Sequence, residues 1–371
     1  MKRIALVISV WMVALISSAQ SYYIFPKKDS TSRYIRLLFA GDAMQHSPQL
    51  NAAYNSKKHT YNYEPNFRYL RSYIDEADVN IVNVETTFPG SNYSGYPRFR
   101  TPDAFFYSLV DAGFQVFALA NNHVMDADQK GLQRTLKVMQ DYPNMGAYLN
   151  AEQREERYPI ILNVGGLKIA LFNTTYGTNQ LLPVKPNIVN YIETEQIEID
   201  IANSLKDESI DLRIMMVHWG TEYQLQYNAY QHGLAQWFAD LGFDVVIGSH
   251  PHVVQGYEVI TAADGRLVPV VYSLGNMVSN QRWKDSNGGV LALVDICLDT
   301  KQVSSVLYVP FYVHKGKLAG DGDPNHPNTF NYYCIPTDDY LEGKLPFTLP
   351  TTAVDELKVF DHDTKERVKR N

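Results

Sequence analysis

Five apolar stretches of this chain each end in a short segment that presents an acidic, amide or imidazole side chain, and this repeat limits the folds the chain can adopt. The segments are, in chain order, FAGDAMQH, NVETTF, ALANNHVMD, MMVHWG and DVVIGSHPH. Each stretch has the length and apolar composition of a buried strand. Because the carboxyl ends of parallel strands gather at one edge of a sheet, we expect the polar side chains that follow them to lie together.

The polar side chains at these strand ends are oxygen and nitrogen donors that bind metal ions. Each alone is more often a structural residue of a turn, but five strand ends of the same kind together indicate a metal site. A donor set without thiolates favours zinc, manganese or iron over a cysteine-type structural zinc. We therefore predict a centre for two divalent ions, with a water clamped between them and activated for hydrolysis. The candidate ligands are Asp42, His46, Glu85, Asn122, His123, Asp126, His218, His250 and His252.

The amino-terminal segment has the pattern of an export signal. Lys2 and Arg3 precede an apolar run over residues 4–16, and Ser17 and Ala19 supply the small residues of a cleavage site. We predict a signal peptide over residues 1–19, a polar linker over 20–33, and a location in the periplasm or cell envelope. The alternative is an uncleaved amino-terminal membrane anchor, although the run is short for a membrane span.

The overall charge argues against a nucleic-acid partner. Lys and Arg total 33 against 40 Asp and Glu, which gives a formal net charge of −7, the opposite of a phosphate-binding surface. The two cysteines, Cys297 and Cys334, fit either a disulfide or two free thiols. Composition therefore indicates an exported globular protein and leaves the redox state of the cysteines open.

Strand and helix patterns alternate through the first part of the chain and give way to strands later. Alternation of this kind indicates parallel strands buried on both faces, and the second half suggests a second sheet packed against the first, with helices outside. The tail after residue 350 is charged and expected to be peripheral. The predicted strands are 35–40, 79–84, 115–119, 160–163, 168–173, 212–217, 243–247, 253–260, 268–273, 290–296 and 303–313, and the predicted helices are 67–75, 103–112, 130–139, 193–205 and 229–241.

The order of the motifs over residues 35–280 resembles the CapA family, bacterial capsule-synthesis proteins associated with poly-γ-glutamate. The motifs are Gly41-Asp42-x-Met44, Asn83-x-Glu85, Ala120-Asn121-Asn122-His123-x-x-Asp126, His218-Trp219-Gly220-x-Glu222-Tyr223, Gly248-x-His250-Pro251-His252 and Tyr272-Ser273-Leu274-Gly275-Asn276. This family is similar in turn to the calcineurin-like metallophosphatases. The resemblance implies an α/β fold of four layers, αββα, in which helices flank two mixed β-sheets. It also implies that this domain covers residues 34–320 and that 321–371 form a carboxyl-terminal extension.

The resemblance also implies roles for the site residues. Glu85 corresponds to a carboxylate that bridges two metal ions. The other ligand positions of the superfamily fall on Asp42, Asn122, His218, His250 and His252, so these six residues are the predicted metal ligands. His123 corresponds to the acid that protonates the leaving group, and Asp126, in the same motif, is the second predicted catalytic residue. Met44 departs from the pattern, because the superfamily has a His at that position. His46 falls where relatives often carry Arg, so it is expected to be a substitute ligand or a phosphate contact.

Four further residues are expected at the substrate side of the site. Trp219 and Tyr223 follow a strand end and either stack on substrate or pack at the rim of the core. Glu222 could orient His218 through its second ring nitrogen. Arg100 either faces an anionic substrate or is solvated.

Two functions fit these observations. The first is a metal-dependent hydrolase that acts on exported surface polymer, at a phosphoester or at an amide such as a γ-glutamyl bond. The second is a non-catalytic assembly or binding factor for capsule polymer that uses the same pocket. A periplasmic nucleotidase is suggested by superfamily analogy alone. The expected partners are an anionic polymer or phosphoester substrate and membrane-bound capsule synthesis machinery.

Overall fold

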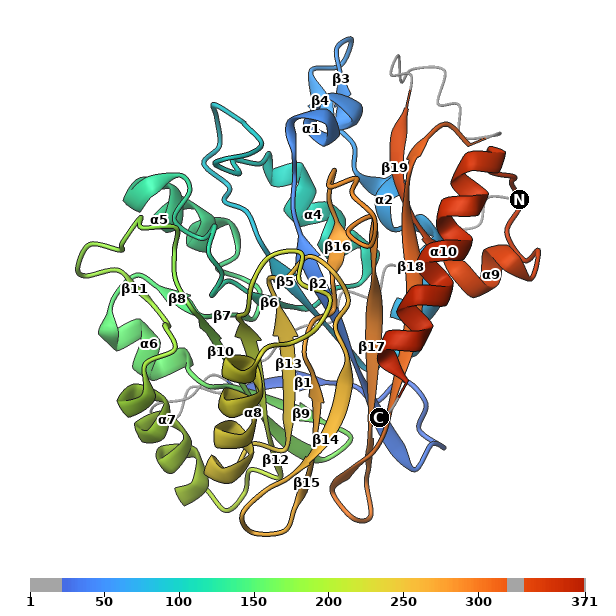
Figure 1. Ribbon diagram of the computed structural model, residues 1–371. Helices are drawn as coiled ribbons and strands as arrows, with labels where there is room; N and C mark the ends of the chain where they lie inside the picture. The colour runs from blue at the N-terminus through green and yellow to red at the C-terminus, as the bar shows by residue number, and fades with distance from the viewer. Residues whose placement is uncertain (1–21, 319–329, 370–371) are drawn as a thin grey trace, which may run out of the picture.

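The structure is a computed structural model that describes residues 22–318 and 330–369 (Figure 1). The signal peptide predicted over residues 1–19 lies outside the described residues. Within the two described ranges, no helix is both long enough and apolar enough to cross a membrane.

One sheet has seven strands in the order β1-β9-β10-β12-β13-β15-β14. Strands β10, β12, β13 and β15 run parallel. Crossover helix α7 (Thr194–Lys206) returns the chain from β10 to β12, and α8 (Ala229–Leu241) returns it from β12 to β13. Strands β9 and β10 form a hairpin, with Gly165 and Gly166 at positive φ in its turn. The strands are β1 (Tyr22–Phe25), β9 (Ile160–Val164), β10 (Leu167–Thr175), β12 (Leu212–His218), β13 (Val245–Ser249), β14 (Tyr257–Thr261) and β15 (Leu267–Val271).

The other large sheet has eight strands in the order β19-β18-β17-β2-β5-β6-β7, with β16 also paired to β2. Strands β2, β5, β6 and β7 are parallel, and β17 runs antiparallel to both β2 and β18. The strands are β2 (Tyr34–Ala43), β5 (Val79–Val84), β6 (Val116–Ala118), β7 (Asn144–Met145), β16 (Asn276–Val278), β17 (Gly288–Cys297), β18 (Gln302–Gly316) and β19 (Asn331–Pro336).

The remaining elements connect or cover these sheets. Helices α1 to α5 belong to the crossovers of the second sheet. They are α1 (Ser47–Ala53), α2 (Glu64–Phe67), α3 (Arg71–Glu76), α4 (Asp103–Ala112) and α5 (Asp128–Val138). The others are η1 (Arg68–Leu70), α6 (Ala151–Arg157), α9 (Thr337–Leu341), α10 (Thr351–Val368) and the short strands β3 (Tyr54–Asn55), β4 (Thr60–Tyr61), β8 (Ala147–Tyr148) and β11 (Ile188–Val189).

Alternating side chains of the central strands divide the core into layers. On β2, Leu37 and Phe39 face the core between the two sheets, whereas Leu38 lies in the core beneath helices α2 to α5. On β12, Ile214 belongs to the core between the sheets, whereas Met215 packs with helices α7 and α8. Since successive strand residues point to opposite faces, both faces of each sheet are buried. The predicted αββα sandwich is therefore confirmed.

The segment predicted as a polar linker contains an edge strand of the first sheet. Strand β1 pairs in parallel with β9 over four residues, and the side chains of Tyr23 and Phe25 pack against the core between the sheets. The apolar run Tyr22–Phe25 is long enough for an edge strand, although the lysines and serines around it obscure the pattern.

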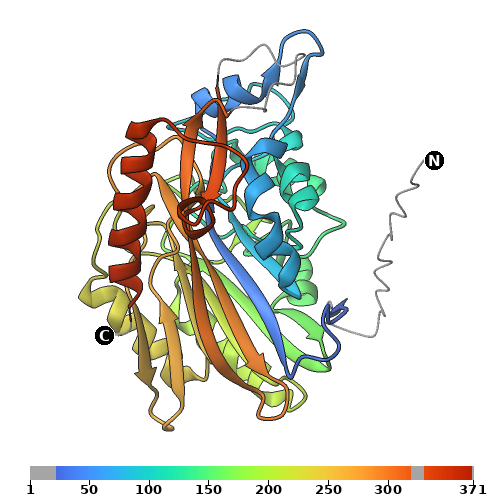
Figure 2. The ribbon, with the colours of Figure 1, turned by 90° about the vertical axis from the view of Figure 1, so that its right-hand side faces the viewer.

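The tail predicted to be peripheral forms helix α10, which lies against β18 (Figures 1 and 2). Leu357 and Phe360 are buried in the core between the sheets, on a helix whose other positions are largely charged. The high charge content of this segment hid its narrow apolar stripe. Within the described residues, Cys297 and Cys334 are free thiols.

We predict that Gly41→Ala destabilises the protein, because a Cβ at Gly41 would lie 2.0 Å from the carbonyl oxygen of Gly275. Both groups are backbone, so the strands must separate, at a cost of about 1–3 kcal/mol or more. Gly233→Ala is the matched control: a Cβ there meets no atom within 4 Å, and in an exposed helix it should stabilise by up to about 1 kcal/mol. Urea unfolding measures both, and equal stability of the two variants would contradict the prediction.

Candidate metal centre

The two sheets bring their ligand-bearing strand ends to one place. Asp42 lies at the end of β2 and Glu85 directly follows β5, both in the eight-stranded sheet. His218 ends β12 and His250 directly follows β13, both in the seven-stranded sheet. Since all four strands are parallel members of their sheets, their carboxyl ends form adjoining edges.

The segment from Tyr272 to Asn276 joins the two sheets beside these ligands. Leu274 donates its backbone N–H to the carbonyl of Gly248, and Asp42 donates its own N–H to the carbonyl of Gly275. A Cβ at Gly248 would lie 2.0 Å from the carbonyl oxygen of Tyr272. The glycines before Asp42 and His250 are therefore required for close backbone approach.

Glu85 lies at the centre of the cluster and is fully buried. Its Oε1 atom is 3.9 Å from Nε2 of His123, 3.7 Å from Nε2 of His218 and 3.9 Å from Nε2 of His252. Neither carboxylate oxygen has a hydrogen-bond partner among the described residues. These distances exceed a hydrogen bond, and they leave space for a cation between the donors.

Asp42 is buried beside Glu85 and is held from both sheets. Its Oδ1 accepts a hydrogen bond from Asn83 at 2.8 Å, and its Oδ2 lies 2.9 Å from His252 Nδ1 and 3.2 Å from the backbone N of His250. Burial favours the neutral acid, but the His252 contact and the Asn83 hydrogen bond outweigh it and lower the pKa of Asp42.

Burial also controls the protonation of the other ligands. Desolvation, followed by the negative charge of Asp42, raises the pKa of Glu85 well above its ordinary value. Desolvation, followed by the neighbouring imidazoles, lowers the pKa of His218 well below its ordinary value. Desolvation likewise lowers the pKa of His250 to about 3. These two imidazoles are thus neutral at pH 7, as metal binding requires.

The donors form two groups that share Glu85. Glu85, His218 and His250 offer one ligand atom each within 4.8 Å of one another, and so do Asp42, Glu85 and His252. Asn122 Oδ1 lies 3.0 Å from His218 Nε2 and adds a fourth donor to the first group. The orphaned oxygens of Glu85 and the unpartnered Nδ1 of His250 fit this interpretation. The side chains can hold divalent cations, and all six predicted ligands converge.

The loop that carries two of the histidines has an unusual backbone. His250 has φ of 100° and His252 has φ of 59°, in the left-handed region that non-glycine residues rarely adopt. Such conformations occur where the surrounding structure imposes them, often at functional sites. Here the contacts of His252 Nδ1 and the His250 N–H with Asp42 hold the loop.

His123 and Asp126 form a pair at the edge of the cluster. Nδ1 of His123 lies 2.7 Å from Oδ2 of Asp126, which also accepts the backbone N–H of Phe99 at 2.6 Å. A carboxylate at Nδ1 fixes the proton there and turns Nε2 towards Glu85. The two predicted catalytic residues are therefore placed together, next to the metal ligands.

The structure separates the predicted substrate-side residues. His46 Nδ1 lies 3.3 Å from the backbone N of Asn280, and its ring contacts Phe99, which also contacts His123. Burial lowers the pKa of His46 to about 4. Glu222 is exposed and groups with His250 and His252. The ring of Tyr223 lies 6.0 Å from that of His252.

Trp219 is fully buried, whereas Arg100 is half-buried. Trp219 stacks on Tyr272 and donates its indole N–H to the Tyr272 carbonyl at 2.9 Å. It therefore packs the core, which was the alternative open at the outset. Arg100 pairs its backbone with Ser94, and its Nε is buried without a partner among the described residues.

Tyr176 is a site residue that sequence reasoning missed. It directly follows β10, donates its backbone N–H to the His218 carbonyl at 3.0 Å, and places its ring 4.6 Å from that of His250. Its side chain is 44% exposed, and burial of the remainder raises its pKa to about 12. Tyr176 follows a sixth strand end, but its aromatic side chain is not one of the acidic, amide or imidazole groups on which the prediction rested, so it gave no signal.

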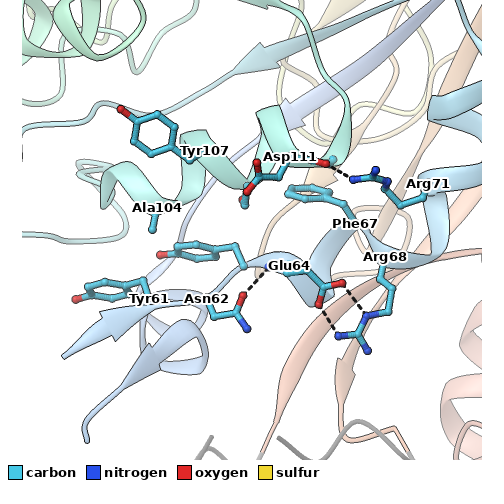
Figure 3. A pocket seen from close by; sticks show the side chains of 12 residues that line it. Tyr61, Asn62, Glu64, Phe67, Arg68, Arg71, Ala104, Tyr107 and Asp111 are labelled. Carbon is cyan, nitrogen blue, oxygen red and sulfur yellow. Dashed lines mark hydrogen bonds and ion pairs between the residues drawn. The ribbon is translucent and has the colours of Figure 1, made fainter. Parts of the chain in front are cut away.

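A pocket of about 450 Å³ lies elsewhere, among β4, α2, α3 and α4 (Figure 3). Three of its charged side chains have partners: Arg68 pairs with Glu64, and Arg71 donates to the backbone carbonyl of Asp111. No imidazole lines this pocket in the described part of the chain. The chemistry therefore concentrates at the Glu85 cluster.

The fold and the cluster together define an αββα protein with a candidate metal centre at the junction of its two sheets. The family described as "Bacterial capsule synthesis protein PGA_cap" matches residues 36–281, a range that holds every predicted site residue. The chain belongs to this family.

Two curated relatives agree with this assignment. The chain is 25% identical over 341 residues to the capsule biosynthesis protein CapA of Bacillus anthracis, covering 85% of this chain and 77% of that protein. It is 29% identical over 216 residues to the PGA biosynthesis protein CapA of Bacillus subtilis (strain 168), covering 57% of this chain and 54% of that protein. The second match thus spans about half of the relative.

Solved structures align more distantly. A structure described as a novel phosphatase of Mycoplasma pneumoniae aligns at 16% identity with a TM-score of 0.47, over 75% of this chain and 94% of that one. A hypothetical protein from Thermus thermophilus aligns at 16% identity with a TM-score of 0.46, over 75% of this chain and 99% of that one. The family assignment rests on the sequence match.

We predict that Glu85→Gln abolishes tight binding of Mn²⁺ or Zn²⁺, because it removes the carboxylate shared by both donor groups. Affinity should fall by more than the about 10–100-fold that loss of an outer-shell partner causes. Asp361→Asn is the control, since Asp361 is another buried carboxylate but pairs with Thr337, away from the ligand cluster. Titration calorimetry measures the affinities. Wild-type affinity in Glu85→Gln would refute the shared-ligand role.

Proposed function

We propose that this protein is an exported, metal-dependent hydrolase of bacterial surface-polymer synthesis, acting on a phosphoester or on a γ-glutamyl type of amide. The observation that carries the proposal is the buried Glu85 carboxylate, which has no hydrogen-bond partner among the described residues and faces three imidazole nitrogens. Such a carboxylate is costly to bury unless a cation compensates it. Membership of the capsule synthesis family supports a role in the synthesis of bacterial surface polymer.

The six ligands would hold two divalent ions, of zinc, manganese or iron. Asp42, Glu85 and His252 would bind one, and Glu85, Asn122, His218 and His250 the other. When bound, such ions lower the pKa of a water and stabilise negative charge on the substrate. Ser249, whose hydroxyl lies 2.8 Å from His218 Nδ1, orients that ring.

His123 would supply the proton that a leaving group requires. Its Nδ1 is engaged by Asp126 at 2.7 Å, so Nε2 is the atom available on the side of Glu85. Asp126 would keep the imidazole in one tautomer and stabilise the imidazolium form. Alkoxide and amine leaving groups both need such a proton, which is why both bond types stay in the proposal.

The substrate side suits an extended ligand such as a polymer. Tyr176 and Tyr223 flank the histidines and are 44% and 38% exposed. His46 lies near the same centre and could donate to a phosphate or carboxylate oxygen. The name of the Bacillus subtilis relative, PGA biosynthesis protein CapA, supports an anionic polymer as substrate class.

A substrate screen tests the proposal. The purified protein, loaded with Mn²⁺ or Zn²⁺, is incubated with p-nitrophenyl phosphomonoesters and diesters, with nucleotides and with γ-glutamyl peptides. We expect metal-dependent turnover of one of these classes. Binding of poly-γ-glutamate without turnover of any of them would instead support the assembly-factor function.

We predict that His123→Ala and His250→Ala fail in different ways. His250→Ala should lower metal content and activity together, because His250 is a proposed ligand. His123→Ala should retain metal and slow turnover by about 10²–10⁴-fold, the loss expected without acid catalysis, and substrates with better leaving groups should suffer less. Metal analysis and steady-state kinetics measure both effects. Equal loss of metal in the two variants would make His123 a ligand or a structural residue.

We also predict that the mature protein begins near Gln20 and is found outside the cytoplasm, in contact with membrane-bound capsule synthesis machinery. Lys2, Arg3 and the apolar run that follows motivate this prediction. Amino-terminal sequencing of protein from cell fractions checks it. A cytosolic protein that retains Met1 would refute export, and a membrane-bound protein that retains Met1 would indicate an anchor.

A further inference from the structure

The loop between β16 and β17, residues 279–287, forms one wall of the metal centre. The backbone N–H of Asn280 faces His46 Nδ1 at 3.3 Å. The amide of Gln281 donates to the hydroxyl of Tyr223 at 3.1 Å, and the ring of Trp283 lies edge-on to that of Tyr223 at 6.0 Å. The 279–287 loop thus holds Tyr223 where it faces His252.

Asn276 connects this loop to a proposed metal ligand. Its side-chain amide donates to the backbone carbonyl of His252 at 3.2 Å, to Gln281 Oε1 at 2.8 Å and to the carbonyl of Ser286 at 2.8 Å. Asn276 is fully buried. A displacement of the loop would therefore disturb the backbone of His252 as well as Tyr223.

Helix α10 holds the outer side of the loop through three ion pairs. Arg282 lies 3.6 Å from Glu356, Lys284 lies 2.9 Å from Asp363, and Asp285 lies 2.5 Å from Arg367. The charges of the loop residues are complementary, in order, to those of the helix residues. We call these three pairs the α10 clasp.

The third pair of the clasp is the most protected from water. The side chains of Arg367 and Asp285 are 11% and 7% exposed, so solvent screens this pair far less than a surface pair. Asp285 also has φ of 72°, a conformation that a non-glycine residue adopts at an energetic cost. Arg367 therefore stabilises the loop at its strained residue.

We propose that α10 is a positioning element of the metal centre, and that Arg367, through Asp285, keeps the 279–287 loop closed over the substrate side of the site. The family match ends at Gln281, within the loop, so α10 lies outside the matched range. The expected effect of α10 on substrate binding rests on the proposed hydrolytic function. The expected effect of α10 on the position of the 279–287 loop does not rest on that function.

Loop protection provides the test that is independent of activity. In Arg367→Met, which keeps the aliphatic stem and removes the charge, hydrogen exchange of residues 279–287 should accelerate by about tenfold or more. Trypsin should cut after Arg282 and Lys284 at a similarly raised rate. Lys365→Met is the matched control, because Lys365 lies on the same helix but pairs with Asp338 and Asp361 and not with the loop. Arg367→Lys should restore part of the protection.

Kinetics test the functional part of the proposal. On any substrate that the protein hydrolyses, Arg367→Met should raise KM by about 3–10-fold with a smaller change in kcat, because Tyr223 loses its support while His123 stays in place. Metal affinity should change less than KM. If Arg367→Met does not fold, Lys284→Met removes the exposed pair and the trypsin site at that residue. Hydrogen exchange of the loop, cleavage after Arg282 and KM should then shift in the same direction, more weakly.

The possible failures are distinguishable. Unchanged exchange and proteolysis in Arg367→Met, or equal changes in Lys365→Met, would overturn the proposal and leave α10 a general stabiliser. A released loop with unchanged KM would overturn its positioning role. If Arg367→Met releases the loop but the protein hydrolyses no substrate, the proposed hydrolytic function is wrong and the role of the α10 clasp in holding the loop is still supported. The affinity for polymer then replaces KM as the functional readout.

Discussion

The buried carboxylate of Glu85 is the group on which the rest of this structure depends. An ionised carboxylate without a partner in the protein interior costs many kcal/mol, and a protein avoids that cost by neutralising the group or by pairing it. Its neighbouring imidazole nitrogens lie at 3.7–3.9 Å, too far for hydrogen bonds and well suited to sharing a cation. The spacing of these donors thus fits side chains arranged around a bound metal ion.

The ligand cluster couples the stability of the two sheets, because each sheet supplies part of it. Asp42 and Glu85 come from the eight-stranded sheet, whereas His218 and His250 come from the seven-stranded sheet. The cluster therefore exists only when the apolar core between the sheets is formed and the segment from Tyr272 to Asn276 connects them. A ligand that binds only this assembled state stabilises the whole sandwich by mass action.

The sequence was sufficient to predict which candidate ligands converge, because their convergence depends on backbone position. Asp42 and His218 sit at strand ends, and the order of parallel strands alone brings such ends together. The direction in which a side chain points depends on local packing and is harder to predict from the sequence. Trp219 follows His218 directly, so it points to the opposite side, into the core with Tyr272. Tyr176 was missed because an aromatic strand end looks like ordinary packing.

Elements outside the alternating pattern of strands and helices were also hard to predict from the sequence, for a different reason. Strand β1 is four residues long and depends on β9, a partner distant in sequence, and no local period identifies such a strand. Helix α10 buries a narrow stripe that includes Leu357 and Phe360, while its charged positions face the 279–287 loop. Those charges lowered the apolar signal of the segment, and they are the same charges that make the clasp.

The two donor groups are unequal, and this has a chemical consequence. Asn122 Oδ1 adds a fourth donor to Glu85, His218 and His250, whereas Asp42, Glu85 and His252 form a group of three acidic and imidazole side chains among the described residues. The exposed Glu222 also groups with His250 and His252. A group of four donors approaches a closed tetrahedral set, and a group of three leaves an open position for water or substrate. Tyr223 and the 279–287 loop lie on the side of His252, the histidine of the open group. Under the proposed function, the loop that α10 is proposed to hold in place would thus lie beside the group that has the open position.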